Sequence, residues 1–159
     1  MFNEISFKSG LTGGELSFKL LWMKYRYIDH TSDLGMEIFG KDLPELFANA
    51  GFAMFDNIVD LSLVEEKKTR TIALKGSNLQ DLFMDWLREL LFIFATEYFV
   101  VKQVSKVDLK DNVLTAELSG EKFDKSRHRV KIEIKTPTYY MFKVEPTKKG
   151  YKATVIFDV

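Results

Sequence analysis

From residue 100 onward, apolar side chains recur at every second position, and this alternation limits what the chain can fold into. Such a pattern is typical of β-strands that bury one face. The turn signals Lys110-Asp111-Asn112 and Lys148-Lys149-Gly150 divide the region into hairpins, which we expect over residues 100–120 and 139–157. A further alternating run covers residues 130–135. The second half of the chain therefore predicts a largely antiparallel sheet.

Two segments of the first half have the three- and four-residue spacing of amphipathic helices. Asp42 is predicted to cap the first helix, with Pro44 and Glu45 in its first turn. Ser77 and Gln80 are predicted to form a capping box at the start of the second. Its apolar stripe is interpreted as core rather than a cofactor pocket and comprises Leu79, Leu82, Phe83, Trp86, Leu87, Leu90, Leu91 and Phe94.

These elements predict an α+β fold of two layers, with a mostly antiparallel sheet and two main helices packed on one face. Further strands are expected at residues 24–28, 35–39 and 63–74. The chain has 159 residues, of which 46% are hydrophobic, and this is enough for one sizeable core. We expect a single domain over residues 23–159, preceded by an N-terminal extension at 1–22. Pro137 predicts a bulge or an edge strand.

Composition excludes several classes of function. Lys plus Arg and Asp plus Glu each number 23, so no global positive field attracts nucleic acid. The absence of cysteine excludes disulfides, thiol catalysis and cysteine-based metal sites. No apolar run approaches the ~20 residues of a membrane span. The first residues lack the basic start and apolar centre of a signal peptide, so we expect a cytoplasmic protein without membrane contact.

A polar turn between two apolar segments, residues 29–35, is the first candidate site. It carries the carboxylates of Asp29 and Asp33, the imidazole of His30 and two hydroxyl groups, and it ends in Gly35. Asp, Ser and Thr also stabilise turns by bonding to their own backbone, which is the structural alternative. Binding groups nevertheless concentrate on loops that a rigid scaffold positions, so both interpretations stay open.

The end of the chain is the second candidate. If the strand predicted at residues 152–157 lies beside the strands that flank the polar turn, Asp158 and the terminal carboxylate of Val159 could converge with Asp33. Carboxylate oxygens suit calcium or magnesium and are poor ligands for copper or zinc. The alternative is a C-terminus that is simply solvated.

A basic stretch at residues 122–135 is the third candidate. It holds six Lys or Arg against Asp124 and Glu133, and it includes Arg127 and His128. Such an excess can contact phosphate groups, although an ordinary solvated strand and loop give the same pattern.

Residues 27–60 resemble the archease family. Members of that family carry an aspartate-histidine-threonine-small-aspartate turn, followed by a helix of the form LxELFxNAxxAMFDxxxD, and both patterns occur here at residues 29–33 and 43–60. The resemblance continues through the Arg127-His128 region to the end of the chain. One departure is Tyr139-Tyr140, where many members have Tyr-His.

The resemblance implies a divalent metal, usually described as calcium, held by Asp33, Asp158 and Val159. Magnesium or manganese is the alternative. Asp29 and His30 are then expected to support the metal site or to face a partner, and Arg127 and His128 to contact a partner.

The resemblance also implies a function. We expect an accessory protein, not an enzyme, that activates the tRNA-splicing RNA ligase by promoting its guanylylation and its multiple turnover, with at most indirect contact with tRNA. No catalytic triad or phosphate-binding loop is found in the sequence. The competing hypotheses are a stand-alone metal-dependent phosphohydrolase that uses Asp33 and Asp158, and a small RNA-binding or chaperone-like module that uses the basic stretch.

Overall fold

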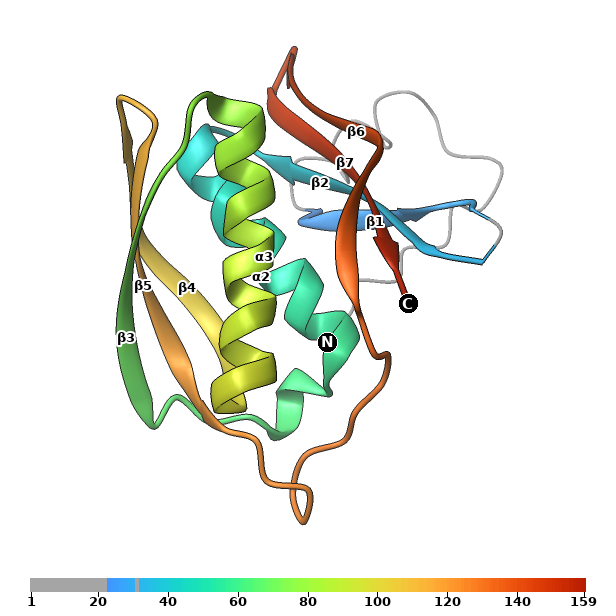
Figure 1. Ribbon diagram of the computed structural model, residues 1–159, viewed down its shortest axis with the longest axis vertical. Helices are drawn as coiled ribbons and strands as arrows, with labels where there is room; N and C mark the ends of the chain where they lie inside the picture. Colours follow the sequence, from blue (N-terminus) through green and yellow to red (C-terminus); the bar gives the residue numbers. More distant parts are fainter. Residues whose placement is uncertain (1–22, 31) are drawn as a thin grey trace.

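Two antiparallel sheets and two long helices form the fold of this chain in the computed structural model, which describes residues 23–30 and 32–159 (Figure 1). The predicted extension at 1–22 lies outside the described residues. The four-stranded sheet has the order β1-β2-β7-β6, made by Tyr25–Ile28, Leu34–Gly40, Gly150–Asp158 and Thr136–Thr147. The three-stranded sheet has the order β3-β5-β4, made by Lys68–Lys75, Val113–Lys122 and Phe99–Lys110.

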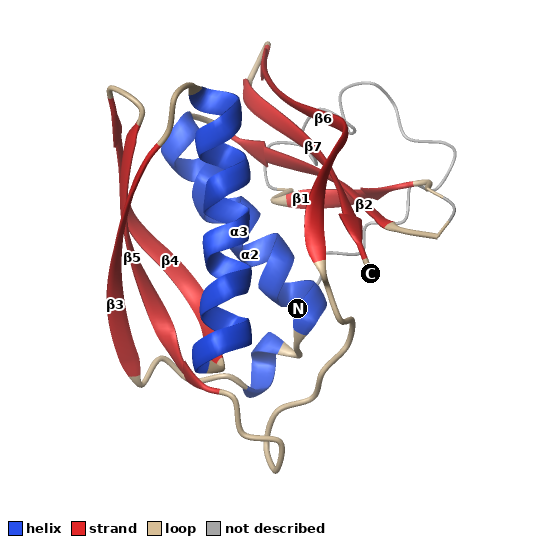
Figure 2. Ribbon diagram, viewed as in Figure 1, coloured by secondary structure: helices blue, strands red, loops and turns tan. Residues whose placement is uncertain are grey.

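The helices α2, Leu43–Ile58, and α3, Leu79–Glu97, lie between the two sheets (Figures 1 and 2). Helix α2 contacts β2 and β7 of one sheet and β4 of the other. A helix covered on two sides needs small residues, and Gly51 shows why, because a Cβ atom built there would lie 2.9 Å from Val104 Cγ2 on β4. The α+β class and the antiparallel pairing are confirmed, while the strands divide into two sheets where one was expected.

The core is aromatic. Trp86 of α3 and Phe47 of α2 are fully buried, and the indole Nε1 of Trp86 donates a hydrogen bond of 2.9 Å to the Phe47 carbonyl oxygen. The Phe47 ring also meets the Phe83 ring edge to face, with centroids 5.0 Å apart. Because a buried indole N–H needs a partner, this hydrogen bond fixes how the two helices pack.

The helix caps confirm one prediction and correct another. Asp42 caps α2, and its carboxylate accepts a hydrogen bond of 2.9 Å from the Glu45 amide. The predicted Ser77–Gln80 capping box is wrong, because the cap of α3 is Asn78, whose side chain accepts from the Asp81 amide at 2.9 Å. The Gln80 side chain instead bonds both backbone groups of Val144 on β6. It therefore ties α3 to the four-stranded sheet, which the local sequence does not reveal.

The strands largely match their predicted positions. Both hairpins of the second half are present, β4 with β5 and β6 with β7. Asp111 and Asn112 have positive φ angles of 52° and 58°, as a tight hairpin turn requires. Strand β6 is an edge strand with a shift in register between Thr138 and Lys143, and this confirms the interpretation of Pro137.

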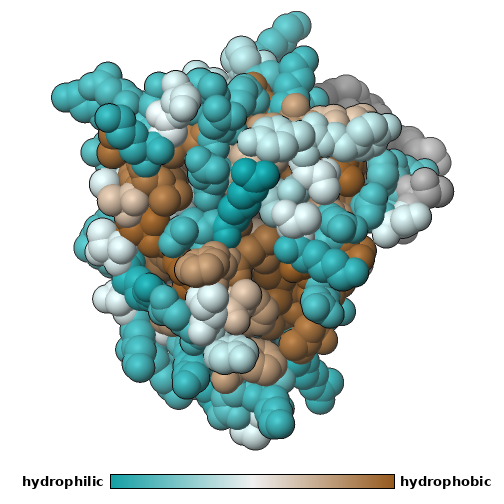
Figure 3. Space-filling view, viewed as in Figure 1, coloured by the Kyte–Doolittle hydropathy of each residue, from teal (hydrophilic) through white to brown (hydrophobic). Residues whose placement is uncertain are grey.

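The alternating run at residues 130–135 belongs to neither sheet. It is drawn as part of the loop that joins β5 to β6 (Figure 2), and its only bridge among the described residues joins Val130 to Val59. The strand expected at residues 130–135 is therefore wrong, because the segment joins neither sheet. Apolar residues gather on the surface between this segment and α3 (Figure 3).

Candidate functional site

The pairing of β2 with β7 brings the polar turn and the end of the chain together. Leu34 pairs with Phe157, so Asp33 and Asp158 stand side by side, one residue beyond the last pair. On its other side, Asp158 pairs with Thr136, and its carbonyl oxygen accepts a hydrogen bond of 2.8 Å from the Lys135 amide. The last strand therefore does lie beside the strand that follows the turn, which was the condition for Asp33 and Asp158 to converge.

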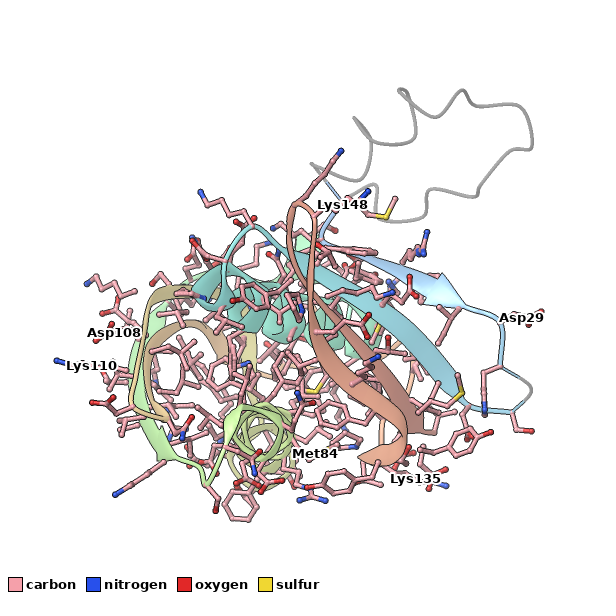
Figure 4. All side chains as sticks on the ribbon, turned by 90° about the horizontal axis from the view of Figure 1, so that it is seen from above. Asp29, Met84, Asp108, Lys110, Lys135 and Lys148 are labelled. Carbon is pink, nitrogen blue, oxygen red and sulfur yellow. The ribbon has the colours of Figure 1, made fainter. Side chains whose placement is uncertain are left out.

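We call this end of the sheet the acidic tip, comprising Asp29, His30, Asp33, Asp158 and Val159. The side chain of Asp33 is 32% exposed, and Asp29, Asp158 and Val159 are exposed. Figure 4 shows Asp29 at one end of the molecule and Asp108 at the opposite end. A partner can thus reach the carboxylates of the tip without any change in the fold.

His30 lies between Asp33 and the ring of Tyr140 on β6. Its Nδ1 lies 3.5 Å from Oδ2 of Asp33, and this buried nitrogen has no hydrogen-bond partner among the described residues. Its ring meets the exposed ring of Tyr140 edge to face, with centroids 5.7 Å apart. The histidine therefore lies beside Asp33 without a hydrogen bond to it.

The donors at the tip suit a hard divalent cation. Asp33 and Asp158 supply carboxylate oxygens, which is the ligand chemistry of calcium and magnesium. Within residues 23–30 and 32–159, no three His, Cys, Asp or Glu side chains cluster closely enough to hold a metal ion. A cation there would consequently depend on backbone or terminal oxygens in addition to the two carboxylates.

A hydrogen-bond network anchors the strand before the turn to α2. The Tyr25 hydroxyl donates to Asp56 Oδ2 at 2.7 Å, and the Tyr27 hydroxyl donates to Asn57 Oδ1 at 2.7 Å. Burial, followed by the hydrogen bond to Asp56, raises the pKa of Tyr25 far above its ordinary value. Gly35, on the other side of the turn, has no room for a side chain, because a Cβ atom there would lie 2.6 Å from Ile28 Cγ1. The turn is therefore held on a rigid base.

The predicted basic site contains a buried acid. Glu121 on β5 is 4% exposed and forms ion pairs with Arg127 and, over 3.5 Å, with Lys67. Its Oε2 accepts a hydrogen bond of 2.6 Å from the Glu65 amide. Burial alone would raise the pKa of Glu121, but the Glu65 amide and the two cations outweigh it and lower the pKa to about 2.

His128 faces the same carboxylate from inside the loop. Its side chain is fully buried, its Nδ1 accepts a hydrogen bond of 2.9 Å from the Asp124 amide, and its Nε2 lies 3.3 Å from Glu121 Oε2. A partner could touch this ring only if the loop opened, whereas Arg127, with 38% of its side chain exposed, can be reached from solvent. The structure does not bring either residue to the acidic tip through any contact among the described residues.

Sequence reasoning missed Glu121 because its burial breaks the alternation of β5. Leu114, Ala116 and Leu118 are the inward positions, and a residue at 121 should face outward, yet it is buried under the loop that follows the strand. Only the neighbouring arginine and histidine in the sequence could have indicated a buried acid.

No helix among the described residues has the length and apolar character needed to cross a membrane.

Comparison with known proteins gives a consistent family. The model of the Archease protein family matches residues 25–159. A protein archease of Archaeoglobus fulgidus is 40% identical over 139 residues, which cover 86% of this chain and 100% of the relative. A protein archease-like of Drosophila melanogaster is 32% identical over 148 residues. That match covers 90% of this chain and 95% of the relative.

Two solved structures have the same fold. The solution structure of protein 1598 of Methanobacterium thermoautotrophicum is 34% identical, with a TM-score of 0.73, and the match covers 86% of this chain and 99% of that one. A crystal structure from Thermotoga maritima, described as an archease and a possible chaperone, has a TM-score of 0.56 over 83% of this chain and 94% of that one. At 21% identity, the second match supports the fold only.

Proposed function

Because this chain belongs to the archease family, we propose that it is an accessory protein that activates the tRNA-splicing RNA ligase, promoting guanylylation of the ligase and its multiple turnover. The observation that carries the proposal is the register of β2 and β7, which sets Asp33 beside Asp158 at an accessible end of the molecule.

We further propose that the acidic tip holds a divalent cation, with calcium first and magnesium or manganese as alternatives. Asp33, Asp158 and the terminal carboxylate of Val159 would be its ligands, and His30 would orient the Asp33 carboxylate from its position 3.5 Å away. When bound, the cation would supply positive charge against phosphate oxygens. The exposed carboxylate of Asp29 would face the ligase, so that the tip docks at the ligase's nucleotide site.

The role of the fold is to keep these groups in place. Tyr25 and Tyr27 bond to α2 on one side of the turn, and the Lys135 amide bonds to Asp158 on the other. Groups held by such supporting contacts need little reorganisation when charge develops near them, and this is the general basis of electrostatic assistance in catalysis. The chain itself contributes positioning, and the chemistry belongs to the ligase.

The experiment measures guanylylation and multiple-turnover RNA joining by the ligase with and without this protein, in calcium, magnesium or manganese. Asp33→Ala and Asp158→Ala should each reduce the stimulation about tenfold or more, as removal of a metal ligand or its support typically does. Asp108→Ala is the matched control, because Asp108 is exposed at the opposite end of the molecule, and it should leave stimulation within about twofold. Calorimetric titration with each metal measures the site independently of the ligase.

Two results would contradict this function. Hydrolysis of a phosphoester by the protein alone, abolished by Asp33→Ala, would indicate a metal-dependent enzyme. Salt-sensitive binding to RNA that is lost when Arg127 and Arg129 become Glu, together with no effect on the ligase, would indicate an RNA-binding module.

A further inference from the structure

Residues 130–135 form an isolated extended segment with one apolar face. Val130 is 56% exposed, Ile132 is half-buried, and Ile134 is 8% exposed, while the alternate residues Lys131, Glu133 and Lys135 are exposed and charged. Successive side chains of an extended chain point to opposite faces, so the three apolar residues share a face. The segment therefore has the side-chain pattern of a half-buried strand, although it lies outside both sheets.

One edge of the segment is tied to the protein. The Lys131 amide donates a hydrogen bond of 2.8 Å to the Ile58 carbonyl oxygen at the end of α2, and the Lys135 amide donates one of 2.8 Å to Asp158. Amides two or four residues apart point to the same side of an extended chain, so residues 131 and 135 define the inner edge.

The opposite edge is open. The amides of Ile132 and Ile134 point away from the inner edge, and neither donates to any group in the part of the chain that the structure describes. An unpaired strand edge is a template onto which another extended chain can pair, unless charge, proline or a covering element blocks it. Of the residues on this edge, Val130 is 56% exposed and Ile132 is half-buried, whereas Ile134 is buried, so a pairing strand would meet residues 130 and 132 first.

A pocket of about 280 Å³ lies against the apolar face of the segment. Its lining comprises Ile58, Phe94, Val130, Ile132, Glu133 and Ile134, and the apolar surface between α3 and the segment marks its place (Figure 3). The volume is slightly below the range of roughly 300–1,000 Å³ found for small-molecule sites. A wall made by a strand edge suits a peptide side chain better than a cofactor, because the peptide backbone can pair with the edge while one side chain fills the pocket.

Charge selects the kind of peptide. Arg129, Lys131 and Lys135 are exposed cations on or next to the segment, and Glu133 and Asp60 are the acids beside them. The Lys131 ammonium also donates a hydrogen bond of 2.8 Å to the Asp56 carbonyl oxygen. Arg127 pairs with Glu121, and Asp60 interacts with Lys131 and Arg129, so part of this positive charge is compensated while the Lys135 side chain adds to it. A peptide that alternates apolar and acidic residues would satisfy both the pocket and these cations.

We propose that residues 130–135 and the adjacent pocket bind an extended, acidic segment of a partner protein by strand addition, with one of its apolar side chains in the pocket. The site is distinct from the carboxylates of the acidic tip, and it requires no metal. The inference does not depend on the ligase being the partner.

The probe is an acetylated hexapeptide that alternates glutamate with valine or leucine, titrated into the full chain and followed by amide chemical shifts and calorimetry. Residues 130–135 and Phe94 should shift. Val130→Glu should weaken binding about tenfold or more by placing a like charge at the pocket. Val113→Glu is the matched control, because Val113 is also exposed but lies on β5 at the hairpin turn, and it should change affinity less than about twofold.

Two peptides test strand pairing without any change to the protein. N-methylation of alternate amides in one register removes the donors that face residues 132 and 134, whereas methylation in the other register removes donors that face solvent. The first should weaken binding about tenfold or more, and the second less than about twofold.

The proposal is wrong if both methylated peptides bind alike, if Val130→Glu leaves the affinity unchanged, or if the hexapeptide causes no shift at millimolar concentration. It is also wrong if a short single-stranded RNA shifts the same amides at lower concentration than the peptide, because the segment would then be a nucleic-acid surface.

Discussion

Replacement of Glu121 tests how much the buried, ionised carboxylate contributes to the free energy of unfolding. Glu121→Gln keeps the shape of the side chain and can still accept from the Glu65 amide, but it removes the negative charge that faces Arg127 and Lys67. The lowering of the Glu121 pKa from 4.5 to about 2 corresponds to about 3 kcal/mol of folding free energy at neutral pH. Arg127 and Lys67 are 38% and 54% exposed and regain hydration when the charge is lost, so we expect about 2 kcal/mol.

The pH dependence follows from the sign of the shift. A carboxyl group whose pKa is lower in the folded state stabilises the fold above its unfolded pKa of 4.5, and the contribution disappears as pH falls toward 2. Urea unfolding at about pH 7 and about pH 3 should show the difference between wild type and Glu121→Gln decreasing to about half.

Glu117→Gln is the control for this measurement. Its Oε2 lies 3.0 Å from Lys106 Nζ, but the lysine side chain is 75% exposed, so the loss should stay within about 0.5 kcal/mol. A loss below about 0.5 kcal/mol for Glu121→Gln, or a loss that is the same at both pH values, would refute the reasoning about the buried carboxylate.

Two further substitutions test the fold, with chemical denaturation as the measurement. Asn78→Ala should destabilise the protein by about 1 kcal/mol by removing the cap of α3, whereas Ser77→Ala should have almost no effect, and the reverse order would restore the rejected capping box. Gly120→Ala should cost more than about 3 kcal/mol or prevent folding, because its Cβ atom would overlap the Val100 carbonyl oxygen; wild-type stability would show that β4 and β5 can separate at that point.

The residues of the candidate site were named from sequence, and the structure adds where two of them lie. Asp33 and Asp158 were candidates because a polar turn between two apolar segments carries carboxylates that the last strand could approach, and because the resemblance to the archease family covers both. Their proximity follows from the pairing of Leu34 with Phe157. The sequence showed only that the two carboxylates would converge if the last strand paired beside the polar turn. Cation binding and the ligase remain proposals, because they depend on groups that the chain itself does not contain.

Local sequence determined the elements of this protein. The period of the apolar residues distinguishes helix from strand, and the caps and turns depend on neighbours within about four residues. Tertiary structure alone decided how the strands divide into two sheets, that Glu121 is buried under its own loop, and that residues 130–135 leave an edge unpaired. The physical reason is that pairing and burial depend on partners far away in sequence, such as Val59 for Val130 and Glu65 for Glu121, and no local pattern encodes those distances.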